Sequence, residues 1–426
     1  MSPVLKAVPA LSSEFAAEME TLLVGLLGGP LPVGLRAWDG STAGPQDGPA
    51  ITIESPQALR RLLWHPNELG LAQAYVTGEI DIDGDLGAGL RHIWQAVRSG
   101  TVSGPPAPLA LVTAAPLAVR LGRRMGALST PVRPPATQAR LRGRLHSQKR
   151  DSAAIAHHYD LSNEFYALVL DKRLVYSCGY WSSDQSGYTL DDAQTDKLDL
   201  VCSKLELGAG DRLLDVGCGW GATAIHAAQH YGATVTGITL SQEQAKFARG
   251  RVDSLGLGDR VEIRVQDYRE LSGDEFDAVS SLEMGEHVGA TNYPVYTETL
   301  HRVVRPGGRV LVQQMSRGAT APGGGAFIEA FIAPDMNMRP VGDTVNLIEQ
   351  GGLEVIGVQA MREHYVRTID AWADLFEASL DQAVALVGEE MARVWRLYLV
   401  GSSLSFEEGR MGVDQILAIR PNYSGF

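Results

Sequence analysis

The chain has 426 residues, enough for more than one hydrophobic core, so two domains are the first expectation. Hydrophobic residues make up 45% and charged residues 20% of the sequence, a composition that excludes an intrinsically disordered protein. The net charge is −13, and three scattered cysteines exclude a disulfide framework or a zinc site. The first residues lack the basic and apolar regions of a signal peptide. We therefore expect a cytoplasmic protein with no bound metal.

Residues 1–103 are predicted to form a small α+β domain. Residues 51–56 (ITIESP) alternate apolar and polar side chains and end in proline, which indicates a short strand. Ser55 is suited to cap a helix over residues 56–64 that has Pro56 at its first position. A helix and a strand with alternating Ile and Asp are expected within residues 69–86, followed by a helix over residues 86–97.

Residues 104–150 are rich in Pro and Arg and are expected to be a basic linker that faces a membrane. Residues 118–150 hold nine basic residues and no acidic one. A block of one sign suggests an anionic surface, either lipid headgroups or nucleic acid, and interspersed Leu and Val favour lipid. The block contains no Phe, Trp or Tyr to stack on bases, which weakens the nucleic-acid interpretation. A linker that contacts the acidic remainder of the chain is the alternative.

Residues 151–426 are predicted to form a second domain around a parallel sheet. From Gly210 onward, apolar runs alternate with helical patterns at short spacing, which is typical of a doubly wound α/β fold. The predicted strands are 211–218, 234–240, 261–267, 276–283, 307–316, 353–361 and 413–421, and the predicted helices include 222–231 and 241–257. Ligands in such folds lie at the carboxyl ends of the strands. This rule brings together residues 217–221, 239–244, 267–268 and 283–287.

The segment Leu213–Gly221 (LLDVGCGWG) carries the strongest single signal. An apolar run ends in an acidic residue, and Gly217, Gly219 and Gly221 follow at alternate positions, so the backbone can approach a ligand closely. The spacing differs from the dinucleotide fingerprint and fits S-adenosylmethionine better than NAD. Asp215 at the strand end can accept hydrogen bonds from an ammonium group. An ordinary tight turn between strand and helix is the alternative.

Several ordered motifs then resemble one family. They are HHYDLSNEFY (157–166), YSCGYW (176–181), LLDVGCGWG (213–221), TGITLSQEQ (236–244), QDYRE (266–270), EMGEHVG (283–289) and FEEGRMGVDQILAIRP (406–421). Together they are similar to the cyclopropane fatty-acid synthase and mycolic-acid methyltransferase family over residues 155–421. The resemblance implies a Rossmann-like class I S-adenosylmethionine-dependent methyltransferase domain, and the N-terminal unit resembles the small domain of the longer family members.

The resemblance also implies roles for single residues. The residues expected to bind the methionine part of S-adenosylmethionine are Tyr159, Tyr176 and Ser177, with Asp215, Gly217, Gly219 and Trp220 of the first loop. Thr239 and Gln244 would contact the ribose, and Asp267 and Tyr268 the adenine. Cys178, Glu286 and Tyr365 match positions that surround a bicarbonate ion in the family.

Four positions depart from the family pattern. The family's two further positions around the bicarbonate ion are usually His and Ile, and Gln313 and Met315 align with them here. Glu283 and Gly285 stand where the family usually has a small residue and Phe. Methyl transfer to an alkene leaves a carbocation, and a base must then remove a proton. Replacement of His by Gln313 removes a titratable group, and Glu283 adds a carboxylate. This combination favours a methylene product, as in the tuberculostearic-acid methyltransferase branch.

The predicted function is therefore methylation of the cis double bond of unsaturated acyl chains on phospholipids, giving a 10-methylene product. Cyclopropane synthesis is the first alternative, and a small-amine N-methyltransferase or a catalytically silent lipid-binding protein are further ones. The expected location is peripheral, on the inner face of the cell membrane. A reductase acting on the product and a homo-oligomer are expected partners, and nucleic acid is not.

Overall fold

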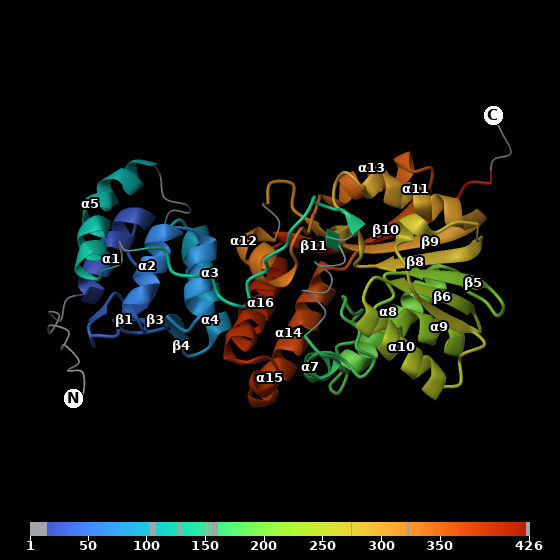
Figure 1. Ribbon diagram of the computed structural model, residues 1–426, viewed down its shortest axis with the longest axis horizontal. Helices are drawn as coiled ribbons and strands as arrows, with labels where there is room; N and C mark the ends of the chain where they lie inside the picture. The colour runs from blue at the N-terminus through green and yellow to red at the C-terminus, as the bar shows by residue number, and fades with distance from the viewer. Residues whose placement is uncertain are drawn as a thin grey trace. The chain divides into compact units, whose positions relative to one another are not determined.

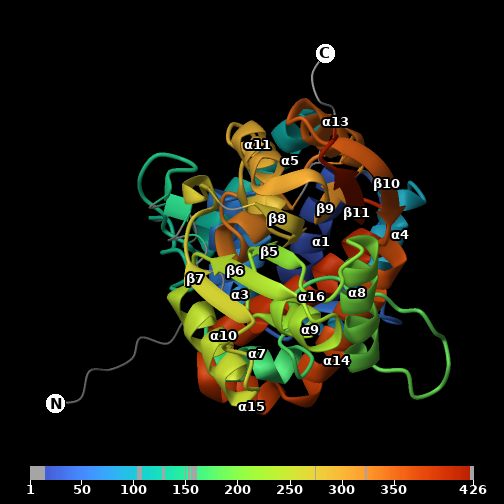
Figure 2. The same cartoon turned by 90° about the vertical axis from the view of Figure 1, so that its right-hand side faces the viewer.

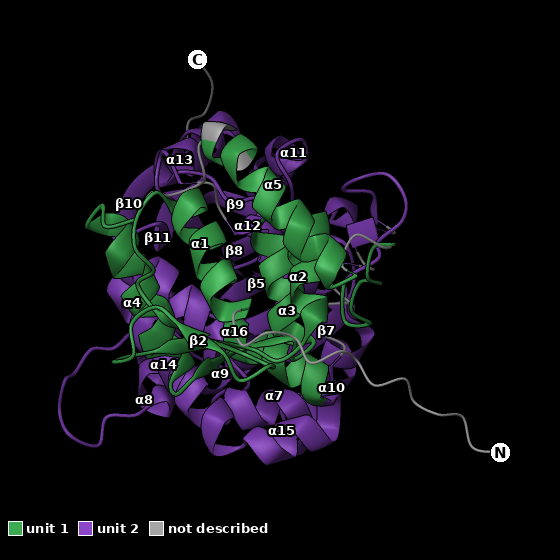
Figure 3. Cartoon of the chain, turned by 90° about the vertical axis from the view of Figure 1, so that its left-hand side faces the viewer, with its two compact units in different colours: residues 1–138, 389–397 green, residues 139–388, 398–426 purple. Residues whose placement is uncertain are grey.

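The structure, a computed structural model, describes residues 15–102, 108–126, 130–148, 150–151, 154, 161–273, 275–321 and 324–422. Its contacts divide the chain into two compact units, shown in two colours in Figure 3. The first unit comprises the residues up to Gln138 together with Glu389–Leu397, and the second comprises Ala139–Gly388 and the residues from Tyr398 onward. The sequence instead predicted boundaries at residues 103 and 150.

The first unit is a four-stranded sheet covered by helices. The strand order is β2-β1-β3-β4, with β1 and β3 parallel and the other pairs antiparallel. The side chain of Ser55 caps α2 by accepting a hydrogen bond from Gln57 N, and Pro56 is the first helical residue, as predicted. The elements are α1 (Phe15–Leu27), β1 (Gly34–Ala37), β2 (Thr42–Ala43), β3 (Ala50–Ile53), α2 (Pro56–Trp64), α3 (Glu68–Val76), β4 (Ile80–Asp83), α4 (Leu86–Arg98) and α5 (Pro108–Arg124).

The helix α5 lies in the segment that we expected to be a linker. Leu121 of this helix is buried in the core of the first unit with Phe15 and Met19 of α1. Arg124 forms an ion pair with Glu18. The apolar residues of the segment therefore serve the core of the first unit, which explains why the unit extends beyond residue 103.

The second unit is a seven-stranded sheet with helices on both faces (Figure 2). The strand order is β10-β11-β9-β8-β5-β6-β7, and β11 is the strand that runs antiparallel to its neighbours. This arrangement confirms the predicted Rossmann-like fold. The strands are β5 (Arg212–Val216), β6 (Thr234–Thr239), β7 (Val261–Val265), β8 (Phe276–Leu282), β9 (Val304–Arg317), β10 (Glu354–Ala360) and β11 (Met411–Ile419).

Both faces of this sheet are buried, which explains the continuous apolar runs of its strands. Leu213 of β5 packs with α8, α9 and α10 on one face, whereas Leu214 packs with α11 and α13 on the other. The same two groups of helices can be followed above and below the sheet in Figure 1. The helices are α7 (Asn163–Val169), α8 (Leu190–Lys204), α9 (Ala222–His230), α10 (Gln242–Ser254), α11 (Tyr293–Val303), α12 (Gly325–Phe327), α13 (Val341–Gln350), α14 (Arg362–Ala378), α15 (Leu380–Val387) and the part of α16 (Glu389–Glu407) that follows Leu397.

Three short helical turns complete the unit. These turns are η1 (Tyr268–Glu270), η2 (Gly285–His287) and η3 (Ile328–Ile332). Two of them, η1 and η2, directly follow the strands β7 and β8. The strand order reverses between β5 and β8, because the chain proceeds from β5 to β6 on one side and to β8 on the other. Ligands of doubly wound sheets bind at the carboxyl ends of the strands beside such a reversal. The fold therefore places the candidate site at the ends of β5, β6 and β8.

Candidate active site

A glycine loop connects β5 to α9 and forms the floor of the site. Gly217 and Gly219 have φ angles of 80° and 53°, in the left-handed region where a side chain is strained. The backbone N–H groups of Gly217 and Cys218 both donate to the carbonyl of Ile238, at 2.9 Å each, and so fasten the loop to the end of β6. A Cβ atom on Gly219 would meet no atom within 4 Å, so the backbone there borders open space.

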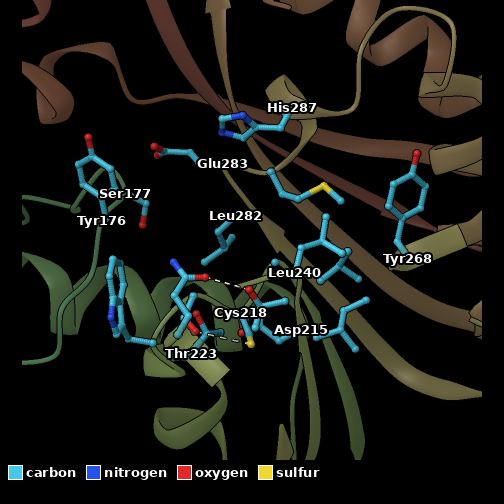
Figure 4. Close-up of a pocket in the computed structure, with 18 of the residues that line it drawn as sticks. Tyr176, Ser177, Asp215, Cys218, Thr223, Leu240, Tyr268, Leu282, Glu283 and His287 are labelled. Atoms are coloured by element: carbon cyan, nitrogen blue, oxygen red, sulfur yellow. Dashed lines mark hydrogen bonds between the residues drawn. The ribbon is translucent and has the colours of Figure 1, made fainter. Parts of the chain in front are cut away.

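A cavity of about 150 Å³ lies above this loop (Figure 4). Tyr176, Ser177 and Glu283 lie toward one side of the cavity and Tyr268 lies at the opposite side (Figure 4). The predicted site residues that line it are Tyr176, Ser177, Asp215, Gly217, Gly219, Trp220, Thr239, Gln244, Tyr268 and Glu283. Tyr159 lies outside the described residues. Asp267, Cys178, Glu286, Tyr365 and Gln313 do not line the cavity.

Asp215 supplies a buried carboxylate to this cavity. Its Oδ1 accepts a hydrogen bond from the Ser280 hydroxyl at 2.8 Å, whereas Oδ2 is buried with no partner among the described residues. Burial raises the pKa of Asp215 to about 6. A buried carboxylate oxygen without a donor is costly, so a cationic group of a ligand would satisfy it. The ammonium group of S-adenosylmethionine has this chemistry.

The ends of β6 and the start of α10 supply two polar groups at the middle of the cavity. The Thr239 hydroxyl donates to Gln244 Oε1 at 2.8 Å, and Ser241 caps α10 by accepting from Gln244 N. Thr239 and Gln244 are therefore held in fixed positions on the cavity wall. These are the two residues that we expected to contact a ribose.

Asp267 does not reach the cavity as we expected. Its two carboxylate oxygens are taken by Arg269, whose Nε and Nη2 donate at 2.8 and 2.6 Å, while Arg269 also pairs with Asp151. The neighbouring Tyr268 does line the cavity. The sequence contains Arg269 only two residues further on, but spacing alone could not indicate that it would occupy the Asp267 carboxylate.

Lys197 of α8 is a cavity residue that sequence reasoning missed. It is 1% exposed, and its Nζ donates to the Ser177 hydroxyl at 3.0 Å. Burial lowers the pKa of Lys197, and the charges of Glu283 and Asp171 oppose this shift. His287 also lines the cavity, and burial lowers its pKa to about 4, so its ring is neutral at physiological pH. Lys197 carries no local sequence signal because it stands within an ordinary helical pattern.

The carboxylate of Glu283 joins three segments that are distant in sequence. Its Oε1 accepts from Cys178 N and from Gln313 Nε2, at 2.8 Å each. Its Oε2 accepts from the Tyr365 hydroxyl at 2.6 Å. Burial raises the pKa of Glu283. Three of the predicted catalytic residues thus surround a fourth, which itself faces the cavity.

Glu283 holds this position with an unusual backbone. Its φ angle is 51°, in the left-handed region that costs a residue with a side chain about 1–2 kcal/mol. Its N–H donates to the carbonyl of Gln313 at 2.6 Å, which fixes the conformation beside β9. A strained backbone persists only where the surrounding structure enforces it.

Glu286 lies near this cluster but forms no hydrogen bond with Glu283 among the described residues. Its Oε1 accepts from Met315 N at 2.5 Å, and within the part of the chain that the structure describes it forms no hydrogen bond with Cys178 or Tyr365. Burial, and then the charge of Glu283, raise the pKa of Glu286 to about 8, so the carboxyl is largely protonated at neutral pH. Gly285 is small because a Cβ there would lie 2.1 Å from Gln314 Oε1.

The fold and the cavity define a class I S-adenosylmethionine-dependent methyltransferase. Residues 146–416 match the family described as Mycolic acid cyclopropane synthetase. The chain is 38% identical over 410 residues to the "Probable fatty acid methyltransferase" of Pseudomonas putida, with 93% of each protein covered. The chain belongs to the mycolic acid cyclopropane synthetase family.

Two further relatives have informative names. The chain is 31% identical over 403 residues to the "Tuberculostearic acid methyltransferase UfaA1" of Mycobacterium tuberculosis (strain ATCC 25618 / H37Rv), which covers 92% of this chain and 88% of that one. The solved structure of mycolic acid cyclopropane synthase CmaA1 complexed with SAH and CTAB superposes with a TM-score of 0.60 and 30% identity. The superposition covers 63% of this chain and 98% of the CmaA1 chain. The protein is thus an enzyme that uses S-adenosylmethionine.

Proposed function

We propose that this enzyme methylates the cis double bond of unsaturated fatty acyl chains carried by phospholipids, and that its product has a methylene branch. The relatives named fatty acid methyltransferase and tuberculostearic acid methyltransferase support the acyl substrate. The observation that carries the proposal is the Glu283 carboxylate, half-buried and facing the cofactor cavity. An acceptor that becomes a cation needs such a group.

The chemistry explains this need. S-adenosylmethionine supplies an electrophilic methyl group, and an alkene that accepts it becomes a carbocation. Burial of the side chains around Glu283 excludes water that would quench the cation. Tyr176 and Tyr365 both pack against Trp372, the first tilted and the second edge-on, with ring centroids 5.3 and 5.9 Å apart, so aromatic rings accompany the carboxylate. Aromatic faces and carboxylates both stabilise positive charge.

The methylene product is favoured by the identity of the groups around Glu283. Gln313 donates to Glu283 and accepts from Gln415 Nε2 at 2.9 Å, so its amide is fully engaged and cannot take a proton. A hydride shift along the chain followed by proton loss from the added methyl group gives the exocyclic alkene, whereas proton loss without the shift gives the ring. Reduction of the methylene group would require a separate reductase, which we propose as a partner.

A basic surface of the second unit supports a membrane-bound substrate. Arg140, Arg142 and Arg144 are exposed and form no ion pair with any residue that the structure describes. Leu145 beside them is 57% exposed. Cations interleaved with an exposed apolar side chain suit the surface of an anionic bilayer. Arg150 differs, because it is paired with Asp335. No helix within the described ranges is long and apolar enough to cross a membrane.

The experiment combines purified enzyme, methyl-labelled S-adenosylmethionine and vesicles of dioleoyl phosphatidylglycerol. Fatty-acid methyl esters prepared from the vesicles are separated by chromatography and identified by mass spectrometry and by their alkene proton signals. Distearoyl vesicles are the control, since they contain no double bond. We expect label in a methylene-branched chain. A cyclopropane product would refute the proposed methylene product. Label found only on small amines would refute the proposed acyl substrate.

A further inference from the structure

We propose that Glu283 is the general base of this enzyme, and that its carboxylate takes the place that the family resemblance gives to a bound bicarbonate ion. The enzyme then works without that ion. This inference rests on the proposed function, because it assigns the proton-removing step of alkene methylation. It goes further by stating which molecule supplies the base.

The donors that would hold a carboxylate-shaped anion are already satisfied. Cys178 N, Gln313 Nε2 and the Tyr365 hydroxyl all donate to the two oxygens of Glu283, at 2.6–2.8 Å. The Cys178 thiol points elsewhere, toward the carbonyls of Gly179 and Met361. A bicarbonate ion would therefore find neither donors nor space at this position, and these residues do not fit it.

The charges point to the same conclusion. A second anion at this position would lie beside Glu283, whose charge already raises the pKa of the nearby Glu286. The cation that faces Glu283 is Lys197, which also faces Asp171, Asp215 and the Ser177 hydroxyl. One buried lysine is thus already shared among three carboxylates. The site can balance its own carboxylate but not an additional anion.

The backbone conformation of Glu283 is a further observation in favour of a functional role for its carboxylate. Glu283 has a φ angle of 51°, a conformation that glycine adopts without strain and glutamate does not. Each of its three donors comes from a different segment: the loop before α8, strand β9 and helix α14. The observed strain therefore coincides with a fully formed hydrogen-bond cluster, whose central residue Glu283 faces the cofactor cavity (Figure 4).

The proposed step is balanced in atoms and electrons. A C–C bond forms as the S–CH₃ bond breaks, which leaves a neutral thioether and a carbocation on the acyl chain. A hydride then shifts from the methylated carbon to the neighbouring cationic carbon, which moves the positive charge to the methylated carbon. The added methyl group loses a proton to Glu283, and the electron pair of the broken C–H bond becomes the new exocyclic C=C bond. Glu283 later releases the proton to solvent. Cys178 N, Gln313 and Tyr365 position the carboxylate throughout, and no oxidant or reductant is needed.

The test compares the wild-type enzyme with Glu283→Gly, Glu283→Gln and the control Glu363→Gln, which alters an exposed carboxylate. The first measurement is the binding of ¹³C-labelled bicarbonate, detected by the broadening of its NMR signal. We expect no binding to the wild type and to the control, and binding to Glu283→Gly, because that variant frees three donors. Bicarbonate binding to the wild type would overturn the inference, whether or not the enzyme methylates lipid.

The second measurement is the methylation rate in buffer depleted of carbon dioxide. We expect the wild-type rate to change less than twofold when bicarbonate is added. Glu283→Gln should lose at least about 100-fold in kcat, with its affinity for S-adenosylmethionine changed less than about threefold. Bicarbonate or acetate should partly restore the rate of Glu283→Gly. Retention of the wild-type rate by Glu283→Gln would overturn the inference.

A third variant keeps the inference testable if the Glu283 variants fail to fold. Tyr365→Phe removes one donor from the carboxylate and leaves the carboxylate in place. Loss of a hydrogen bond to the charged form raises the pKa of the base, so the acid limb of the pH–rate profile should move to higher pH. An unmoved acid limb would count against Glu283 as the base. Failure of the wild type to methylate any acyl chain would instead refute the proposed function.

Discussion

Asp215 should make cofactor binding depend on pH. Its Oδ2 is buried and unpaired among the described residues, and its pKa is raised by burial to about 6. The free enzyme therefore carries a neutral Asp215 below this pH and a carboxylate above it. Only the carboxylate attracts the ammonium group of S-adenosylmethionine. Binding should weaken as pH falls through 6.

The expected magnitude follows from the fraction that is ionised. With a pKa of about 6, roughly nine-tenths of Asp215 is ionised at pH 7 and roughly one-tenth at pH 5. If the ionised form alone binds the cation, the Kd should rise about tenfold between these values, equivalent to about 1.4 kcal/mol. Asp215→Asn should bind more weakly than the wild type at pH 7, and its Kd should change little with pH.

Isothermal titration calorimetry with S-adenosylmethionine between pH 5 and pH 8 measures this effect. His287 does not interfere, because its pKa is about 4, and Tyr268 stays neutral because its pKa is about 12. Glu283 also faces the cavity with a raised pKa, so the series is repeated in Glu283→Gln, where the Asp215 effect should persist. A wild-type Kd that is constant within twofold from pH 7 to pH 5, or an equal pH dependence in Asp215→Asn, would refute the reasoning.

Three further outcomes are expected. Gly219→Val puts a β-branched side chain at a φ angle of 53°, where the backbone borders the cavity. Calorimetry should therefore show that the affinity for S-adenosylmethionine falls at least tenfold, and wild-type affinity would contradict the assignment of this loop to the cofactor site. Replacement of Arg140, Arg142 and Arg144 by Gln should reduce the fraction of enzyme that sediments with anionic vesicles and leave cofactor affinity unchanged. Added salt should also reduce vesicle binding by the wild type, because charges are screened over about 8–10 Å at physiological ionic strength. Equal vesicle binding by the variant and the wild type at low salt would contradict the proposed membrane-binding surface. Glu286 has a pKa of about 8 in the folded state against 4.5 ordinarily, so between these pH values the native state holds a proton that the unfolded state has released, and wild-type stability falls as pH rises through them. Relative to the wild type, the free energy of unfolding of Glu286→Gln from denaturant titrations should therefore increase from pH 5 to pH 9, by as much as about 5 kcal/mol, and an equal pH dependence of the two proteins would contradict this.

The strands and the glycine loop could be predicted because their signals are local. Residues 213–216 form a continuous apolar run with an acidic residue, and a strand buried on both faces needs such a run. The helix α5 could not be predicted in the same way. Its prolines and arginines resemble a linker, and its place is decided by the burial of Leu121 against α1, a contact distant in sequence.

The hydrogen-bond cluster around Glu283 also depends on contacts between residues that are distant in sequence. The resemblance brought Cys178, Gln313 and Tyr365 together as the surroundings of an ion. It could not predict that Glu283 would accept hydrogen bonds from all three, because these donors lie 105, 30 and 82 positions away. The Asp267 carboxylate could not be excluded from the cavity either, since its pairing with Arg269 depends on side-chain conformation.

The left-handed backbone of Glu283 has an evolutionary consequence. A single base change converts a glutamate codon into a glycine codon, and glycine adopts a φ angle of 51° without strain. That substitution would leave the three donors in place and open an anion-sized hollow between them. A lineage could therefore exchange a base encoded in the gene for one drawn from dissolved carbon dioxide by one mutation. In the role proposed for Glu283, the base is part of the protein and does not depend on the dissolved carbon dioxide of the cell.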